Sequence, residues 1–375
     1  MTTMPALVIG GTGPSGPHVV RGLLERGYDV AVFHRGVHEP PDMPDVEHIH
    51  GDPHFAETIA DALGSRQFDV VVSMYGRLRI IADFMAGRCR QLVATTGTIG
   101  YENCLLPHRG IPSGMKVMAR EDGPKADSSG EAPSFSASAL AAERNVLSHA
   151  LAGDYQGTVI RYPTLYGPHN VVPQEWSIIK RIRDGRSFML VTDGGLSITS
   201  RCAARNAAHG VLSAVDYSLI ANGEAYNCAD RDQYTVGQWI ELVAHIMGAK
   251  LEVVPIPLDI GMATFAELSP MPGRVPHGIL DTTKIRQELG FDDVIDAPTA
   301  IAEYVSWLEE HPPDLIDHAS GFVDQFDYDS EDRLLKAYRT AVARILAEVP
   351  RPVPVRRHAM PHPKVPSSGR DASGR

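Results

Sequence analysis

The sequence predicts an α/β protein with a Rossmann-type, doubly wound parallel sheet and a smaller C-terminal α/β lobe. Short apolar runs alternate with amphipathic helical segments through the first half of the chain. A glycine-rich turn joins the first run to the first helix, and the alternation loosens after about residue 168. Strands that alternate with helices pair in parallel through right-handed crossovers, because each helix must cross one face of the sheet.

The elements of the first half follow from the spacing of apolar residues. The first helix has Val19, Val20 and Leu23 on one face and Gly27 as its stop signal. Short, largely apolar runs are typical of strands buried on both faces of a parallel sheet. The predicted strands are 6–10, 29–33, 69–74, 91–96 and 158–162, and the further predicted helices are 54–63, 77–86 and 136–151.

The second half predicts a less regular arrangement. Thr235 and Gln238 form a capping-box pair at the start of a helix in "YTVGQWIELVAHIMG". Short strands are expected near "EAYNCA" and "LEVVPI", and helices at 297–310 and 329–347. We expect four segments: 1–168 with the large sheet, to which some later segments return, 169–311 as mainly the smaller lobe, 312–349 as a helical extension and 350–375 as a tail.

Composition and charge exclude several classes of protein. No apolar stretch is long enough to span a bilayer, and the chain enters its first strand directly, without a secretory signal. The four cysteines lie far apart, which is typical of reduced thiols in a cytoplasmic protein. The formal net charge of −11 argues against nucleic-acid binding. The basic tail 350–375 is proline-rich and lacks aromatic residues, so we expect it to be disordered.

A dinucleotide site is predicted at "VIGGTGPSG". Gly10, Gly13 and Gly16 lie between the first predicted strand and the first predicted helix. A turn of this kind lets backbone N–H groups and the helix N-terminus approach a pyrophosphate. The alternative is a tight turn that binds no ligand. The strand before the turn and the helix after it favour the dinucleotide.

The end of the second strand indicates which dinucleotide binds. NAD sites carry an acid there for the ribose 2′-hydroxyl, and that acid would repel a 2′-phosphate. This chain reads "AVFHRG", without an acid, and Arg35 offers a permanently charged, planar fork suited to phosphate. The sequence therefore favours NADP(H), with NAD(H) as the alternative cofactor. An exposed loop arginine with no ligand is the other interpretation of Arg35.

Three histidines in "HIHGDPH" resemble metal ligands. His48 and His50 could point to the same side of a short strand, and His54 follows them closely. The "GD" pair at 51–52 stands at a distance from the glycine turn that suits a loop contacting adenine. We therefore expect an adenine-contacting loop and no metal.

Residues 101–133 combine glycine, proline and charge with little periodicity. A loop of this length is uncommon in a compact domain and often covers a site. It also follows a strand end, where ligands of open α/β sheets bind. A lid and an inert insertion are the two interpretations.

The landmarks of the chain resemble those of the extended short-chain dehydrogenases/reductases, particularly the NAD-dependent epimerase/dehydratase group. The likeness covers about residues 5–310 and includes "GGTGPSG", "RYPTLYGP" at 161–168 and "LDTTKIRQELGF" at 280–291. It implies an N-terminal NAD(P)-binding domain, a C-terminal substrate lobe and, by analogy, a homodimer. The cofactor-binding residues expected are Gly10, Thr12, Gly13, Pro14, Ser15, Gly16, His34, Arg35, Asp52, Pro53, Ser73, Met74, Thr95, Tyr162 and Pro163.

The family's catalytic groups are only partly matched. The family uses a Ser or Thr after the fifth strand and a Tyr-xxx-Lys pair on the next helix. The tyrosine exchanges a proton with the reacting oxygen, and the lysine lowers the pKa of that tyrosine. Here Thr96 matches the Ser/Thr position, whereas Phe135 and Ala139 stand at the Tyr and Lys positions. The usual proton-transfer pair is therefore absent from the helix.

Three functions are compatible with this loss. The one we favour is an atypical NADP(H)-dependent reductase of a small-molecule carbonyl or alcohol, with a hydroxyl from Thr96, Tyr101 or Tyr75 and with Phe135 as a wall of the site. The second is a non-catalytic NADP(H)-binding sensor or assembly protein. The third is a nucleotide-sugar epimerase or dehydratase with relocated groups, for which His108 and Lys116 are candidates.

Overall fold

The structure is a computed structural model of the 375-residue chain. It describes residues 4–107, 110–127, 133–260, 277–313, 324 and 326–349. The chain forms two compact units, residues 1–326 and 327–375. The described part of the second unit is the helix α12 (Tyr328–Glu348), whose N-cap Asp327 accepts a hydrogen bond from the Ser330 amide. The predicted tail 350–375 lies outside the described residues.

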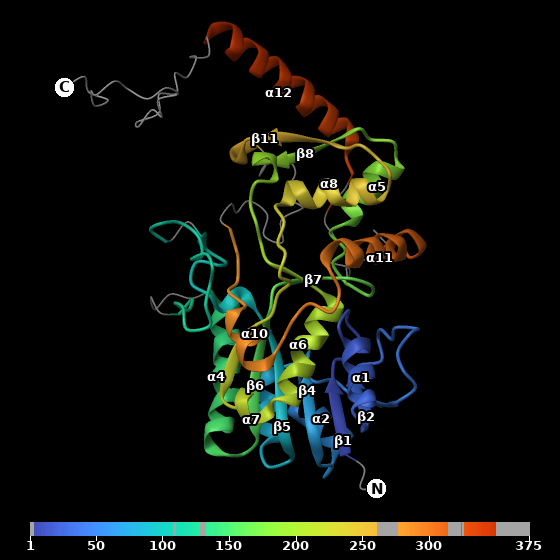
Figure 1. The fold of residues 1–375 in the computed structure, drawn as a ribbon, viewed down its shortest axis with the longest axis vertical. Helices are drawn as coiled ribbons and strands as arrows, with labels where there is room; N and C mark the ends of the chain where they lie inside the picture. Colours follow the sequence, from blue (N-terminus) through green and yellow to red (C-terminus); the bar gives the residue numbers. More distant parts are fainter. Residues whose placement is uncertain are drawn as a thin grey trace, which may run out of the picture. The chain divides into compact units, whose positions relative to one another are not determined.

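A seven-stranded sheet forms the base of the first unit (Figure 1). Its strand order is β10-β6-β5-β4-β1-β2-β3, and every pairing is parallel. This confirms the predicted α/β fold class. The strands are β1 (Met4–Ile9), β2 (Tyr28–His34), β3 (Glu47–His50), β4 (Phe68–Ser73), β5 (Cys89–Gly97), β6 (Gln156–Tyr162) and β10 (Glu224–Asn227).

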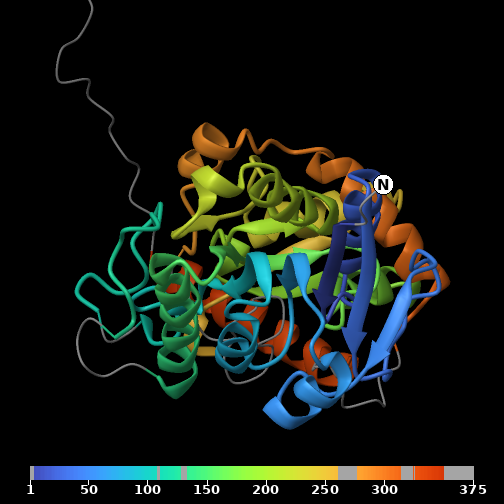
Figure 2. The same cartoon turned by 90° about the horizontal axis from the view of Figure 1, so that it is seen from below.

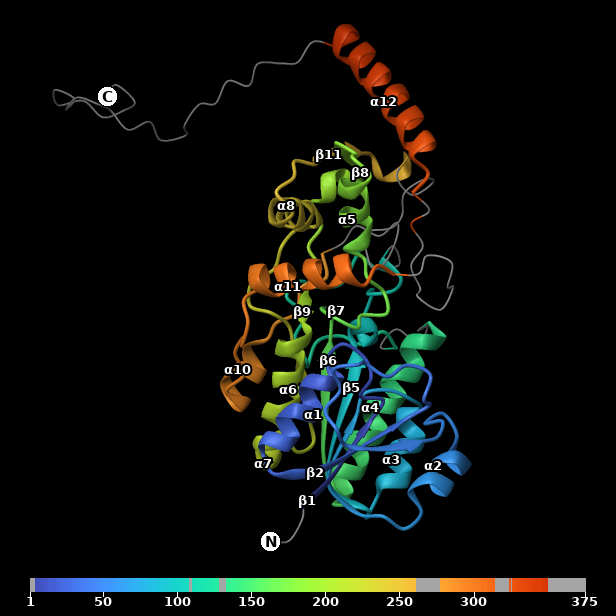
Figure 3. The same ribbon diagram turned by 90° about the vertical axis from the view of Figure 1, so that its right-hand side faces the viewer.

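Helices cover both faces of this sheet (Figures 2 and 3). The helices α1 (Gly16–Glu25) and α6 (Ala204–Asp216) pack together on one face. A Cβ on Gly22 would lie 2.2 Å from Leu212 Cδ1, so glycine allows this close approach. The other face carries α2 (Ala56–Leu63), α3 (Leu78–Met85) and α4 (Ser134–Ala152). Both faces of the central strands are therefore buried, as their apolar runs predict.

A smaller layer is built mainly from later residues. The parallel strands β8 (Phe188–Thr192) and β11 (Glu252–Ile256) pair with each other. The helices α5 (Trp176–Arg183), α8 (Val236–Ile246) and α11 (Ala297–Glu310) surround a second core that contains Trp176, Trp239 and Tyr304. The capping box of Thr235 and Gln238 at the start of α8 is present as predicted. The remaining strands and α-helices are β7 (Thr164–Tyr166), β9 (Arg201–Ala203), α7 (Ser218–Ala221) and α10 (Thr283–Leu289).

Several elements escape prediction because they are short. The strands β7 and β9 have three residues each, whereas the polar strand β3 is the short strand that the sequence suggests for His48 and His50. Such segments take their conformation from a neighbouring strand and carry little apolar periodicity of their own. Within the described residues, no helix is long and apolar enough to cross a membrane.

Candidate functional site

A cavity of about 390 Å³ opens at the carboxyl ends of the large sheet's strands. Ligands of doubly wound folds bind at this edge, where the strand order reverses between β1 and β4. The volume lies within the usual range for ligand pockets. The cavity is lined by Gly10, Gly11, Thr12, Gly13, Pro14, Ser15, His34, Arg35, Gly36, Val37, His38, Met74, Tyr75, Thr95, Tyr162, Leu165 and Val171.

The glycine turn between β1 and α1 forms the floor of this cavity. Gly10 has a φ of +93°, and a Cβ there would lie 2.3 Å from Tyr75 Cβ. A Cβ on Gly16 would lie 1.9 Å from the Gly11 carbonyl oxygen. The fold itself therefore requires these two glycines. A Cβ on Gly13, in contrast, would meet no atom within 4 Å. Gly13 leaves the backbone open toward the cavity, as the close approach of a pyrophosphate requires.

The charge of the cavity comes from the end of β2. Arg35 lines it together with His34 and His38, and no carboxylate is among its lining residues. The Arg35 guanidinium lies 5.3 Å from the centroid of the Tyr75 ring, which is cation–π distance. Burial lowers the pKa of His34, so its imidazole is neutral near pH 7. Arg35 is therefore the permanent positive charge at this end of the cavity.

Ten of the predicted cofactor residues line the cavity and five do not. Asp52 accepts hydrogen bonds from the amide and the Nδ1 atom of His54, which lower the pKa of its carboxyl. Gly16, Pro53, Ser73 and Pro163 also stand outside the lining. The sequence interpretation missed a further group of lining residues, most of them in turns and loops and one, Leu165, on strand β7: Gly11, Gly36, Val37, His38, Leu165 and Val171.

Thr96 lies just beyond the lining residue Thr95, and its hydroxyl is already engaged. It donates a hydrogen bond of 2.7 Å to Glu143 Oε1 on α4. Glu143 is in turn held by the Arg161 guanidinium, with Nη2 2.8 Å from Oε2. Both charged side chains are almost completely buried. In this arrangement the Thr96 hydroxyl uses its only proton within the protein. Toward a ligand it can therefore act only as a hydrogen-bond acceptor.

Tyr101 extends the same buried network and does not line the cavity at the glycine turn. Its hydroxyl donates to Asn227 Oδ1 at 2.6 Å and accepts from Arg161 Nη1 at 3.0 Å. Burial raises the pKa of this phenol. Tyr75, the third hydroxyl expected for catalysis, does line the cavity and is 45% exposed. It stands beside Arg35.

The first turn of α4 contributes nothing to this cavity. The Phe135 side chain is 68% exposed and is absent from the lining residues. Phe135 therefore does not line the cofactor cavity, and its expected role as a wall of the substrate site stays a prediction. Ala139 stands one turn further along and is also outside the lining. At the two positions that the family resemblance assigns to the tyrosine and the lysine, α4 carries Phe135 and Ala139.

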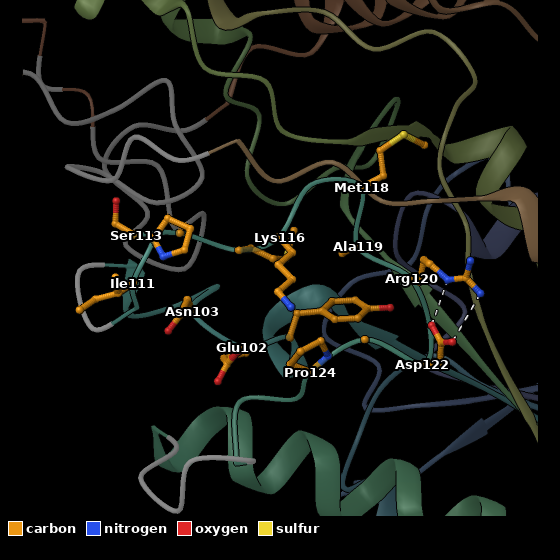
Figure 4. A pocket seen from close by; sticks show the side chains of 15 residues that line it. Glu102, Asn103, Ile111, Ser113, Lys116, Met118, Ala119, Arg120, Asp122 and Pro124 are labelled. Carbon is orange, nitrogen blue, oxygen red and sulfur yellow. Dashed lines mark hydrogen bonds and ion pairs between the residues drawn. The ribbon is translucent and has the colours of Figure 1, made fainter.

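The loop after β5 encloses a second cavity of about 320 Å³. Figure 4 shows the Lys116 side chain extending toward Pro124 and Glu102, among the residues that line this cavity. The loop is fixed where the Ala119 amide donates to the Ile279 carbonyl at 2.7 Å. Residues 108–109 and 128–132, including the candidate His108, lie outside the described residues. Whether the loop is a lid thus stays a prediction.

Solved structures with the same architecture define the fold. A UDP-galactose 4-epimerase matches 83% of this chain over all of its own length, with a TM-score of 0.62 and 17% identity. A dTDP-glucose 4,6-dehydratase from Streptomyces venezuelae, solved with NAD, matches 82% of this chain and 97% of its own, with a TM-score of 0.62 and 18% identity. The chain has the extended short-chain dehydrogenase/reductase fold of the NAD-dependent epimerase/dehydratase group.

The dehydratase of Bacillus anthracis, also solved with NAD, has a TM-score of 0.62 at 16% identity and covers 82% of this chain and 97% of its own. No family model matches the sequence. One curated relative, a Streptomyces protein named 3-diazoavenalumate denitrifying reductase, is 27% identical over 266 residues. That alignment covers 66% of this chain and 82% of the relative. The sequence relative is thus named a reductase, whereas these three solved structures are named an epimerase and two dehydratases.

Proposed function

We propose that the chain binds NADP(H) at the glycine turn and acts as an NADP(H)-dependent reductase of a small molecule. The observation that carries this proposal is the lining of the cavity, which combines Arg35 with an open backbone at Gly13 and contains no carboxylate. A 2′-phosphate needs a cation and no neighbouring acid. The adenosine end of NADP(H) fits this part of the site.

The substrate must accept a hydride without a proton from α4. Bound NADPH supplies a hydride to a substrate held beside it. A ketone also needs a proton at its oxygen, but Phe135 and Ala139 offer none and the Thr96 proton is given to Glu143. The protein is therefore suited to positioning an acceptor that is already strongly electrophilic. An epimerase would in addition need a base at the carbinol, which further favours the reductase.

An aryl diazonium group is an acceptor of this kind. It takes one hydride at its terminal nitrogen and becomes a neutral aryl diazene. The diazene then loses N₂, and its N–H hydrogen ends on the ring carbon, so that no oxygen has to be protonated. The name of the curated relative, a denitrifying reductase of a diazo compound, supports this substrate class for the present chain.

The cofactor part of the proposal is tested by titrating NADPH and NADH into the wild type and Arg35→Ala. We expect the wild type to prefer NADPH. In the variant, NADPH should bind roughly 10-fold to 100-fold more weakly, since a charge-assisted contact contributes about 1.5–3 kcal/mol. NADH affinity should stay within about 3-fold in the same variant, because its ribose lacks the phosphate that Arg35 would contact. Equal affinities in the wild type would refute NADP(H) specificity.

The substrate part is tested by stopped-flow measurement of NADPH oxidation. One panel contains aryl diazonium or diazoquinone compounds, and a matched panel contains the corresponding ketones and phenols. We expect oxidation and N₂ release only with the first panel. Turnover of sugar ketones alone would favour an epimerase-like activity. Tight NADPH binding with no oxidation in either panel would favour the non-catalytic binding protein.

A further inference from the structure

Three histidines and one glutamate converge beside the cofactor cavity. His34 is the last residue of β2, and His48 and His50 stand on β3. In the parallel register His34 pairs with His50, and Val32 pairs with His48, so the three imidazoles project from the same face of the sheet. Glu39 reaches them from the loop between β2 and β3.

Their four donor atoms all lie within 4.8 Å of one another. His34 Nε2 lies 2.8 Å from His48 Nδ1 and 3.6 Å from Glu39 Oε1. Glu39 Oε1 lies 3.9 Å from His48 Nδ1 and 3.3 Å from His50 Nε2. Ligands about 2.0–2.1 Å from a tetrahedral zinc ion stand roughly 3.3 Å from one another. These four separations, from 2.8 to 3.9 Å, lie on both sides of that value.

We propose that His34, Glu39, His48 and His50 form a binding site for a divalent transition metal ion of the zinc type. Imidazole nitrogens with one carboxylate are the donor set that such ions prefer, whereas Mg²⁺ and Ca²⁺ prefer oxygen ligands. This proposal departs from our sequence expectation of no metal. That expectation weighed His48 and His50 with His54, but His54 Nδ1 is bound to Asp52 Oδ1 at 2.7 Å and takes no part.

Without an ion, a hydrogen bond between His34 and His48 holds part of the cluster together. The Gly36 amide donates to His34 Nδ1 at 3.1 Å, so the neutral His34 carries its proton on Nε2 and donates it to His48 Nδ1. An ion would take the place of that proton. His34 then has to carry its proton on Nδ1 and lose the bond from Gly36. His50 Nε2 donates to Glu39 Oε1 at 3.3 Å, so His50 also has to move its proton to Nδ1, whereas His48 needs no such exchange. Metal binding therefore includes a change of tautomer at His34 and at His50.

The ion would fasten the loop after β2 to β3. Arg35, Gly36, Val37 and His38 belong to this loop and line the cofactor cavity. Glu39 follows them directly and is otherwise 46% exposed. Coordination would convert an exposed connection into a fixed wall of the cavity. The role is structural and does not depend on the reaction that the protein performs.

The test is an equilibrium titration of the full-length, untagged, metal-stripped protein with Zn²⁺, and with Co²⁺ followed by visible absorption. We expect one tight site per chain, a tetrahedral Co²⁺ spectrum and a higher melting temperature with Zn²⁺. His50→Ala and Glu39→Gln should each weaken binding by more than about 10-fold, because even partners of metal ligands contribute at least that much. His50 is 62% exposed, so neither change removes core packing.

His54→Ala is the matched control, since it removes a nearby histidine that the site does not use. It should leave Zn²⁺ affinity and the Co²⁺ spectrum unchanged. Absence of saturable binding by the wild type would overturn the proposal, and so would binding that neither His50→Ala nor Glu39→Gln weakens. An octahedral Co²⁺ spectrum would also contradict the tetrahedral donor set.

Discussion

The glycine turn and the region around the start of α4 differ in whether their functional groups remain available to a ligand. At the turn, Gly13 meets no neighbouring atom, and Arg35 forms no ion pair within the described residues. Near α4, the Thr96 hydroxyl is given to Glu143 and the Phe135 ring faces solvent. The first region keeps groups available for a ligand, whereas the second uses its polar groups within the fold. A protein of this kind can hold a cofactor firmly and leave the proton chemistry to its substrate.

The largest expected effect comes from Gly13→Val. Its side chain would occupy the space through which a pyrophosphate approaches the backbone. Loss of two charge-assisted hydrogen bonds at about 1.5 kcal/mol or more each weakens NADPH binding roughly 100-fold or more. Stability should change by no more than about 0.5 kcal/mol, since no protein atom is displaced. Fluorescence titration and thermal melting measure the two quantities.

Gly10→Ala is a contrasting variant, because it should affect stability as well as cofactor binding. Its Cβ would collide with Tyr75 Cβ at a position where φ is +93°, so both stability and binding should fall. If Gly13→Val binds NADPH like the wild type, the open backbone at Gly13 has no role in the cofactor site.

The intermediate effect is expected for Thr96→Ala. Because Thr96 gives its proton to Glu143, the loss should appear mainly as about 1–2 kcal/mol of stability. Turnover should fall by less than about 10-fold, in contrast to the ~100-fold or more that removal of a general acid costs. Thr96→Ser keeps the hydroxyl and should restore stability. A large loss of turnover with unchanged stability would instead make Thr96 a catalytic residue.

Sequence patterns predicted those features whose conformation depends on residues close together in the chain. The glycine turn, the buried strands and the capping box at Thr235 all depend on residues within a few positions of one another. The engagement of Thr96 depends on Glu143, 47 residues later, and that of Tyr101 on Asn227, 126 residues later. No periodicity in the chain reports such partners. The fold was therefore predictable, but the availability of its hydroxyls was not.

The histidine cluster shows the same limit at shorter range. The sequence placed His48 and His50 on one side of a strand, as the structure does. It gave no sign that Glu39 and His34 would join them, because that depends on the path of the loop after β2. Metal sites assembled across two strands are visible only once the register is known.

The smallest effect is expected for Phe135→Leu. The ring is 68% exposed and lines no part of the cofactor cavity, so its loss removes little buried surface. Stability should stay within about 0.5 kcal/mol of the wild type. NADPH affinity and turnover should change by less than about 2-fold, since no transition-state contact is lost. Melting curves, cofactor titration and steady-state kinetics of the same preparation measure these quantities.

Leu140→Ala is the matched control on the same helix. Leu140 is 3% exposed, and truncation of a buried leucine costs about 2–5 kcal/mol, so this variant should show that α4 responds to a loss of packing. A fall in turnover of 10-fold or more in Phe135→Leu, with stability retained, would mean that the start of α4 closes over the substrate. The contrast between the two regions would then be one of conformation, with Phe135 contacting the substrate only in the bound state.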